Sequence, residues 1–346
     1  MSQKYNKVDT NIDLSLFNLK SDKVSEEVLV KKQAHKSISK IDVIEDIDNR
    51  SISIEQAIKI LNQQWKLSGL RSRTIQTYNY NFNRFVEVTK VEFLNQINSQ
   101  KIYDFLASLG DVRDSSLNGV LKQIKAVLSK CHDNGWYESR FWKNVKIKVN
   151  KTIKEAATEQ EITLLLSLLD KSTYSGMRDS IAIILLVKTG IRIKTLGELR
   201  EGNIDFDNQL LKLQGDIMKS HKPLFLPLSD DMCTLLKELI AINGAIRRDH
   251  KQKNDYIFLS NTGVPISKTV SPSNLIAKNL WVYSKKWGLK NVNAHSLRRL
   301  FAQRLINSGA DINLVSHALA HSDLTTTSIY LGLNPNTVAK NLRDYI

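Results

Sequence analysis

Residues 294–305 read AHSLRRLFAQRL and place two distinctive side chains three positions apart, His295 and Arg298. Side chains three apart are neighbours on a helix surface, so an imidazole and a guanidinium would share one face. The same stretch has an apolar face formed by Leu300, Phe301 and Leu305. The sequence therefore predicts a helix with one side in a core. A lone histidine in such a helix is more often structural than catalytic, so the rest of the chain has to decide.

Arg192 provides a second guanidinium, about a hundred residues earlier. It ends the sequence Thr189-Gly190-Ile191-Arg192, which follows an apolar helical run over residues 180–188. An arginine at the start of a helix could simply cap it or pair with Glu198. A guanidinium can also donate to two oxygens of one phosphate, which a lysine cannot imitate.

Residues 319–330 read LAHSDLTTTSIY and contain His321 and a terminal Tyr330. A phenol is a weak nucleophile at its usual pKa of about 10, so it needs cationic neighbours and a proton acceptor. Such neighbours would be Arg192, His295, Arg298, His321 and Lys219, a lysine in the polar turn 215–223. Together the six side chains suit metal-free chemistry on a phosphodiester.

These residues and their spacings resemble the tyrosine recombinase (phage integrase) family, strongly over residues 186–346 and more weakly from residue 52 onward. By that resemblance Arg192, His295, Arg298 and His321 hold the scissile phosphate, and Tyr330 is the nucleophile. Lys219 would protonate the departing 5′ oxygen, with Lys222 as the fallback because hairpin lengths vary.

The resemblance implies a site-specific recombinase that cuts and rejoins duplex DNA through a 3′-phosphotyrosyl intermediate, without a metal, ATP or another cofactor. The expected partner is double-stranded DNA, bound by a dimer at each site and by a tetramer in synapsis. Such a protein would belong to a mobile element or prophage. Further residues expected to contact DNA are Arg71, Arg73, Thr74, Lys122, Lys125, Lys151, Lys222 and Arg299.

Three positions depart from the family pattern. Thr195 stands where an acid is usual, with Glu198 one helical turn further on, and Asn203 stands where Asp is common. Ala320 replaces a usual glycine, which matters only if the backbone needs a positive φ. Loss of the acid could slow catalysis. The alternative is therefore a non-catalytic, sequence-specific DNA-binding regulator, such as a repressor, on the same fold.

Other interpretations of the C-terminal block stay open. His317 and His321 are four apart, as zinc ligands on a helix are, but no glutamate lies between them and no third ligand is evident. Residues 310–330 could form a helix-turn-helix, and Tyr330 could be a core residue. A topoisomerase-like activity would relax DNA without a specific site. These alternatives leave the joint spacing of the six residues unexplained.

Charge favours a polyanionic partner. The net charge is +15, and residues 1–50 contain nine basic and nine acidic residues, so the whole excess belongs to residues 51–346. Basic residues can serve solubility alone, but lysines and arginines placed on phosphates release counterions and give salt-sensitive binding.

The remaining composition points to a cytoplasmic protein without disulfides. The chain has no run of about 18 apolar residues, and its first residues, MSQKYNKVDT, do not resemble a secretion signal. Cys131 and Cys233 lack the spacing of a disulfide framework or a zinc finger.

The predicted fold is mainly α and has three parts. Residues 1–50 form an extension, disordered or loosely attached, with a protein-contacting helix at 41–47 as one option. Residues 51–150 form a helical core DNA-binding domain. Residues 155–346 form an α+β catalytic domain for DNA breaking and rejoining, with a small antiparallel sheet. The lysine-rich stretch 145–155 is a linker or a solvated edge strand.

Within the first domain, one helix begins after a Ser53 cap and a second after Ser72 or Thr74, with two more over 99–109 and 115–134. Aromatic residues close its core, namely Trp136, Phe141 and Trp142. In the second domain a Thr158–Glu161 capping box opens a helix, and further helices are predicted over 180–188, 231–241 and beyond residue 260. Predicted strands cover 203–213, 223–228 and 255–259.

Overall fold

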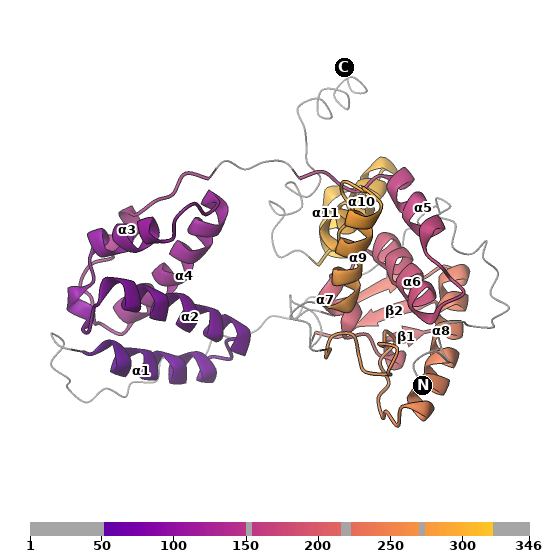
Figure 1. Ribbon diagram of the computed structural model, residues 1–346, viewed down its shortest axis with the longest axis horizontal. Coiled ribbons are helices and arrows are strands. Elements are labelled where there is room, and N and C mark those ends of the chain that lie inside the picture. Colours follow the sequence, from indigo (N-terminus) through magenta and orange to yellow (C-terminus); the bar gives the residue numbers. More distant parts are fainter. Residues whose placement is uncertain (1–51, 150–153, 216–222, 270–273, 321–346) are drawn as a thin grey trace, which may run out of the picture. The chain divides into compact units, whose positions relative to one another are not determined.

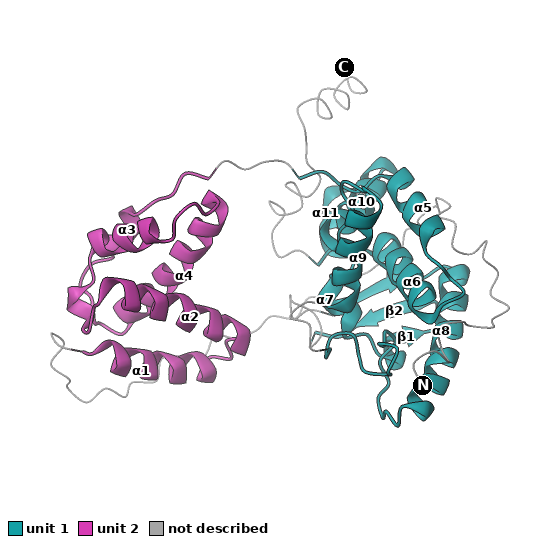
Figure 2. Cartoon of the chain, in the orientation of Figure 1, with its two compact units in different colours: residues 1–29, 153–346 teal, residues 30–152 magenta. Residues whose placement is uncertain are grey.

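The computed structural model describes residues 52–149, 154–215, 223–269 and 274–320 (Figure 1). The chain divides into two compact units, unit 2 with residues 30–152 and unit 1 with residues 153–346 and 1–29 (Figure 2). Each unit has its own hydrophobic core. None of the helices in the described ranges is both long and apolar enough to cross a membrane.

Unit 2 is entirely helical over its described residues. Its α-helices are α1 (Ile54–Leu67), α2 (Ser72–Thr89), α3 (Ser99–Ser108) and α4 (Asp114–Asp133), with short 3-10 turns at Leu94–Gln96 and Phe141–Asn144. Helix α2 contacts the other three. It buries Phe82 and Phe85 fully, and the Phe85 ring meets the Phe105 ring edge-on at a centroid distance of 5.5 Å. Helix α2 therefore packs an apolar face into the core of unit 2.

One of the two predicted helix caps in unit 2 is confirmed and the other is wrong. The Ser53 hydroxyl accepts a hydrogen bond from the amide of Gln56 at 3.2 Å. Neither Ser72 nor Thr74 caps α2, because Arg71 is the capping residue and its side chain makes no capping bond. The amide of Thr74 donates to the Arg71 carbonyl at 2.8 Å, so Thr74 already lies in the first turn.

Unit 1 packs helices around a three-stranded antiparallel sheet of order β1-β2-β3, which confirms the predicted α+β class. Its helices are α5 (Glu159–Leu168), α6 (Tyr174–Thr189), α7 (Ile193–Gly197), α8 (Asp230–Asp249), α9 (Leu275–Lys286), α10 (Ala294–Asn307) and α11 (Ile312–Ala318). Its strands are β1 (Ile204–Asp205), β2 (Leu210–Leu213) and β3 (Leu224–Pro227). The Thr158–Glu161 capping box is present at the start of α5.

Two strand predictions need correction. The segment 203–213 is two strands, because the Asp205 carboxylate accepts from the amide of Asn208 at 3.0 Å and Gln209 turns the chain with φ +53°. Residues 255–259 form no strand and make only isolated bridges, Arg200 to Tyr256 and Leu259 to Pro265. Helix α8 also runs beyond the predicted residue 241, to Asp249.

Helix α6 is the centre of unit 1. It contacts α7, α8, α9 and α10, and 14 of its 16 residues are buried. A helix that is buried on every side needs such surroundings. It begins at Tyr174, six residues before the predicted start, because Thr173 caps it by accepting from the amide of Gly176 at 3.1 Å.

The added turn of α6 carries a buried ion pair, Arg178–Asp179, in which both side chains are at most 2% exposed. Arg178 also donates to the Leu259 carbonyl at 2.8 Å. The second oxygen of Asp179 accepts from Asn279 and from the Tyr283 hydroxyl, each at 2.7 Å. A buried pair is tolerated when its remaining hydrogen-bonding groups are satisfied. This pair fixes α9 against α6.

Gly190 ends α6 in the left-handed conformation, with φ +61°. A Cβ atom at this position would lie 2.2 Å from Cδ1 of Phe301 on α10. Only glycine fits such a contact, so the backbone leading to Arg192 is held directly against α10.

We predict that Gly190→Ala lowers the free energy of unfolding by about 2–4 kcal/mol, from left-handed strain and overpacking together. Gly288→Ala is the matched control, with φ +65° and no described atom within 4 Å of the added Cβ. Strain alone should cost the control about 1–2 kcal/mol. Urea denaturation compares the two, and equal losses would contradict a role for the Phe301 contact.

Candidate active site

The cap of α10 places the two residues of the His-x-x-Arg pair. The Asn293 side-chain oxygen accepts from the amides of His295 and Ser296, each at 3.1 Å. The Ser296 hydroxyl in turn accepts from the Asn293 amide at 2.9 Å, which completes a reciprocal cap. Helix α10 therefore begins at a fixed residue, with His295 in its first turn and Arg298 one turn further along.

Arg298 is buried, with 3% of its surface exposed, and its guanidinium joins two other segments of unit 1. One terminal nitrogen donates to the carbonyl of Gly190, two residues before Arg192. The other donates to the carbonyl of Leu319, two residues before His321. Arg298 thus links the backbone just before Arg192 to the backbone just before His321.

Arg192 lies at the start of α7 as its capping residue and is half-buried. Asn274, the cap of α9, fixes α7 by donating to the Ile193 carbonyl at 3.1 Å. A Cβ on Gly197 would lie 2.4 Å from the same Asn274 nitrogen, so α7 packs closely here. The position of Arg192 is therefore set from both sides, by the end of α6 and by the start of α9.

Electrostatics shows that these residues share one neighbourhood. His295 is an exposed residue, yet its ring is partly withdrawn from water, and this burial lowers its pKa below 6.5. Four nearby cations lower the pKa of His295 further, Arg299, Arg298, Lys154 and Arg192. The structure thus brings together three of the six predicted catalytic residues, Arg192, His295 and Arg298.

The other three predicted catalytic residues, Lys219, His321 and Tyr330, lie outside the described residues, as do Lys151 and Lys222. Their roles remain predictions.

The other residues expected to contact DNA are described. Arg71, Arg73 and Thr74 lie at the start of α2, and Lys122 is exposed on α4. The Lys125 ammonium donates to the Val145 carbonyl at 2.5 Å, and burial together with Lys146 lowers its pKa. Arg299 donates to the Glu155 carbonyl at 2.8 Å. DNA contact by these residues stays a prediction, and Lys125 and Arg299 already bind backbone carbonyls.

The departures from the family pattern have distinct structural settings. Thr195 is 2% exposed inside α7, and Glu198 ends that helix half-buried. The Asn203 side chain donates to the Lys212 carbonyl at 3.1 Å, a bond that a carboxylate could not make. Ala320 has φ +46°. The backbone before His321 therefore does adopt the conformation in which alanine is strained and glycine is not.

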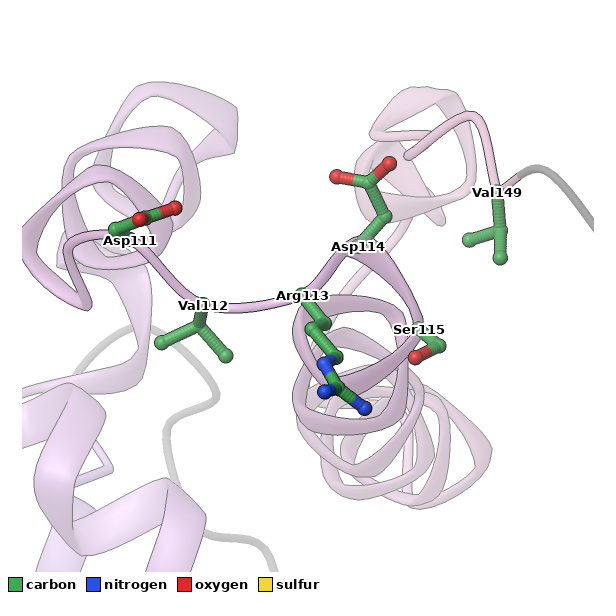
Figure 3. Close-up of a pocket in the computed structure, with 6 residues that line it drawn as sticks. All are labelled: Asp111, Val112, Arg113, Asp114, Ser115 and Val149. Carbon is green, nitrogen blue, oxygen red and sulfur yellow. The ribbon is translucent and has the colours of Figure 1, made fainter. Parts of the chain in front are cut away.

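Two features of the described residues bear on other kinds of site. Among the described residues, no three His, Cys, Asp or Glu side chains gather as a metal site would require, and His317 is exposed on α11. Unit 2 has an open hollow of about 360 Å³ (Figure 3). It is lined by Asp111, Val112, Arg113, Asp114, Ser115 and Val149, none of which is a predicted site residue.

We predict that Ala320→Gly raises the free energy of unfolding by about 0.5–1 kcal/mol, because it removes left-handed strain at the cost of some added chain entropy. Ala277→Gly, within α9, is the control and should lower stability by about 1 kcal/mol. Urea denaturation measures both. A loss of stability in Ala320→Gly as well would contradict the strain.

We also predict that His295 makes stability fall as pH is lowered through 6.5. Its pKa is lower in the folded than in the unfolded chain, so the unfolded chain binds more protons in this interval. The contribution is fully present above 6.5 and is lost as pH falls to the folded pKa. His295→Gln should flatten this part of the stability-versus-pH curve from urea denaturation. An unchanged slope would contradict the lowered pKa.

Comparison with known proteins identifies the family. The sequence model of the Phage integrase family matches residues 155–337, more than half of the chain. The chain is 28% identical to the tyrosine recombinase XerA of Pyrococcus horikoshii over 289 residues, covering 81% of this chain and 89% of the relative. It is 25% identical to the tyrosine recombinase XerD of Staphylococcus saprophyticus over 305 residues, covering 84% and 97%.

The fold is shared with solved structures of lower identity. A lambda integrase dimer bound to a COC′ core site matches with a TM-score of 0.62 and 16% identity, covering 82% of this chain and 78% of that one. The Tn1549 transposon integrase in complex with a circular intermediate DNA gives a TM-score of 0.63 and 15% identity, covering 84% and 99%. From the family match, the chain belongs to the phage integrase (tyrosine recombinase) family.

Proposed function

We propose that this protein is a site-specific recombinase that cuts and rejoins duplex DNA through Tyr330. The observation that carries the proposal is the grouping of Arg192, His295 and Arg298 in one cationic neighbourhood. Arg298 is also bonded to the carbonyl two residues before His321. Relatives named tyrosine recombinases along most of the chain support the same activity.

The proposed reaction needs no cofactor. The Tyr330 hydroxyl attacks a DNA phosphorus, a 3′-phosphotyrosyl bond forms, and the bond to the 5′ oxygen breaks. Lys219 protonates the departing 5′ oxygen. A 5′ hydroxyl of the partner duplex then attacks the phosphotyrosyl phosphorus and displaces Tyr330, so the phosphodiester energy is retained and ATP is not required.

The described residues supply electrostatics and proton transfer in this scheme. Arg192 and Arg298 stabilise the negative charge that develops on the phosphate oxygens, and Arg298 is already oriented by two carbonyls before an anion arrives. The lowered pKa of His295 keeps its imidazole neutral near pH 7. A neutral imidazole can accept the phenol proton of Tyr330, whereas an imidazolium cannot.

The oligomeric state and the roles of the two domains are proposed from the similar recombinases. A related lambda integrase forms a dimer on a core site and a tetramer on a Holliday junction. We propose the same for this chain, a dimer per site and a tetramer in synapsis on DNA in the cytoplasm. Residues 51–150 would serve as the core DNA-binding domain and residues 155–346 as the catalytic domain.

A second candidate function is a non-catalytic DNA-binding regulator. It is favoured by Thr195, which is buried where the family usually has an acid. A hydroxyl at this position carries no negative charge that could orient the active-site cations, which would weaken catalysis.

We predict that the protein forms an SDS-resistant covalent adduct with nicked duplexes, selected for binding from a random-sequence pool, and that Tyr330→Phe abolishes it. Tyr345→Phe is the matched control in the same C-terminal segment and should still form the adduct. Footprinting verifies that both variants bind the selected DNA. Specific binding by the unmodified protein with no adduct under any condition would instead support the regulator.

A further inference from the structure

The segment that enters unit 1 is attached to α10 through its backbone. The amide of Ala157 donates to the Ser296 carbonyl at 3.2 Å. Two residues earlier in the chain, the Glu155 carbonyl accepts from the Arg299 guanidinium at 2.8 Å. Figure 1 shows the start of α5 beside α10. Residues 154–157 therefore lie alongside the first two turns of α10, which contain His295 and Arg298.

Three acidic side chains strengthen the attachment of this segment, because they bind residues of α10 and of the loop that precedes it. The Glu155 carboxylate accepts from the Asn291 side chain at 3.0 Å, and Glu159 forms a two-pronged ion pair with Arg304. Glu161 accepts from the amides of Lys290 and Asn291 at 3.0 and 3.1 Å. Burial alone would raise the pKa of Glu161, but these bonds and those from Thr158 lower it, so the carboxylate stays ionised.

Lys154 is the first described residue of this segment, and its side chain is exposed. It is one of the four cations that depress the pKa of His295, together with Arg192, Arg298 and Arg299. The attachment of Glu155 and Ala157 gives the geometric reason, because it holds the adjacent residue next to the start of α10. The carboxylate of Glu155 is bonded to Asn291 and so is oriented toward another partner.

We propose that Lys154 is a further phosphate-binding residue of the active site, contributed by the segment that joins the two units. Positive charges held close together repel one another, and a bound anion relieves that repulsion. An exposed ammonium close to His295 is suited to a DNA phosphate next to the one that Arg192, His295 and Arg298 would hold. The inference rests on the proposed function in that it takes DNA as the ligand of this site.

The experiment compares Lys154→Gln with Lys253→Gln in the full-length protein. Lys253 is an exposed lysine of unit 1 that does not contribute to the pKa shift of His295, so both variants lose one charge. The His295 pKa is measured by NMR in the free protein. Affinity for a random-sequence duplex is measured as a function of salt concentration.

Lys154→Gln is expected to raise the His295 pKa toward its usual value and to reduce the salt slope of log affinity by about 0.9, the loss of one phosphate contact. Lys154→Arg should restore both values, and Lys253→Gln should leave the His295 pKa unchanged.

Three results would overturn the proposal. The first is a Lys154→Gln variant that matches Lys253→Gln in both measurements. The second is a shifted His295 pKa with an unchanged salt slope, which leaves Lys154 a neighbour of His295 without a phosphate. The third is a reduced salt slope with an unchanged His295 pKa, which places the contact elsewhere. Neither measurement requires Tyr330, so absence of the covalent adduct would count against the recombinase and not against Lys154.

Discussion

The buried guanidinium of Arg298 imposes the constraint on which unit 1 depends. An arginine is always charged and has only donors, so its burial requires acceptors that the backbone must provide. The carbonyls of Gly190 and Leu319 accept from its two terminal nitrogens. Three segments far apart in sequence consequently converge on one side chain: the end of α6, the second turn of α10 and the residues before His321.

This convergence works only because the surrounding backbone is shaped for it. Gly190 follows α6 with a positive φ and lies so close to the Phe301 ring that no side chain would fit. The end of α6 can therefore pack directly against α10. Behind them the Arg178–Asp179 pair fixes α9 to α6, and Asn274 at the start of α9 holds α7. The position of Arg192 therefore follows from packing that begins with a fully buried central helix.

The acidic and the basic side chains near α10 have different surroundings. Glu155, Glu159 and Glu161 bind Asn291, Arg304 and backbone amides at the start of unit 1. Arg299, Arg298, Lys154 and Arg192 lie near His295, where their positive charge favours an anionic ligand. The pKa of His295 is the measurable consequence, because a proton on its ring would add one more positive charge to this group.

The sequence by itself determined most of the helices, the fold class and the family of this chain. Periodic apolar residues and local caps such as Ser53 and Thr158 predicted the helices, since these signals act within one turn. The pair His295 and Arg298 was recognisable because three positions along a helix are adjacent in space. Only the tertiary structure decided the bonds of Arg298 and the place of Lys154. Both depend on partners distant in sequence, and a buried charge reveals its partner only when the chain is folded. The early start of α6 and the split of residues 203–213 follow instead from local hydrogen bonds of Thr173 and Asp205, which apolar periodicity does not reveal.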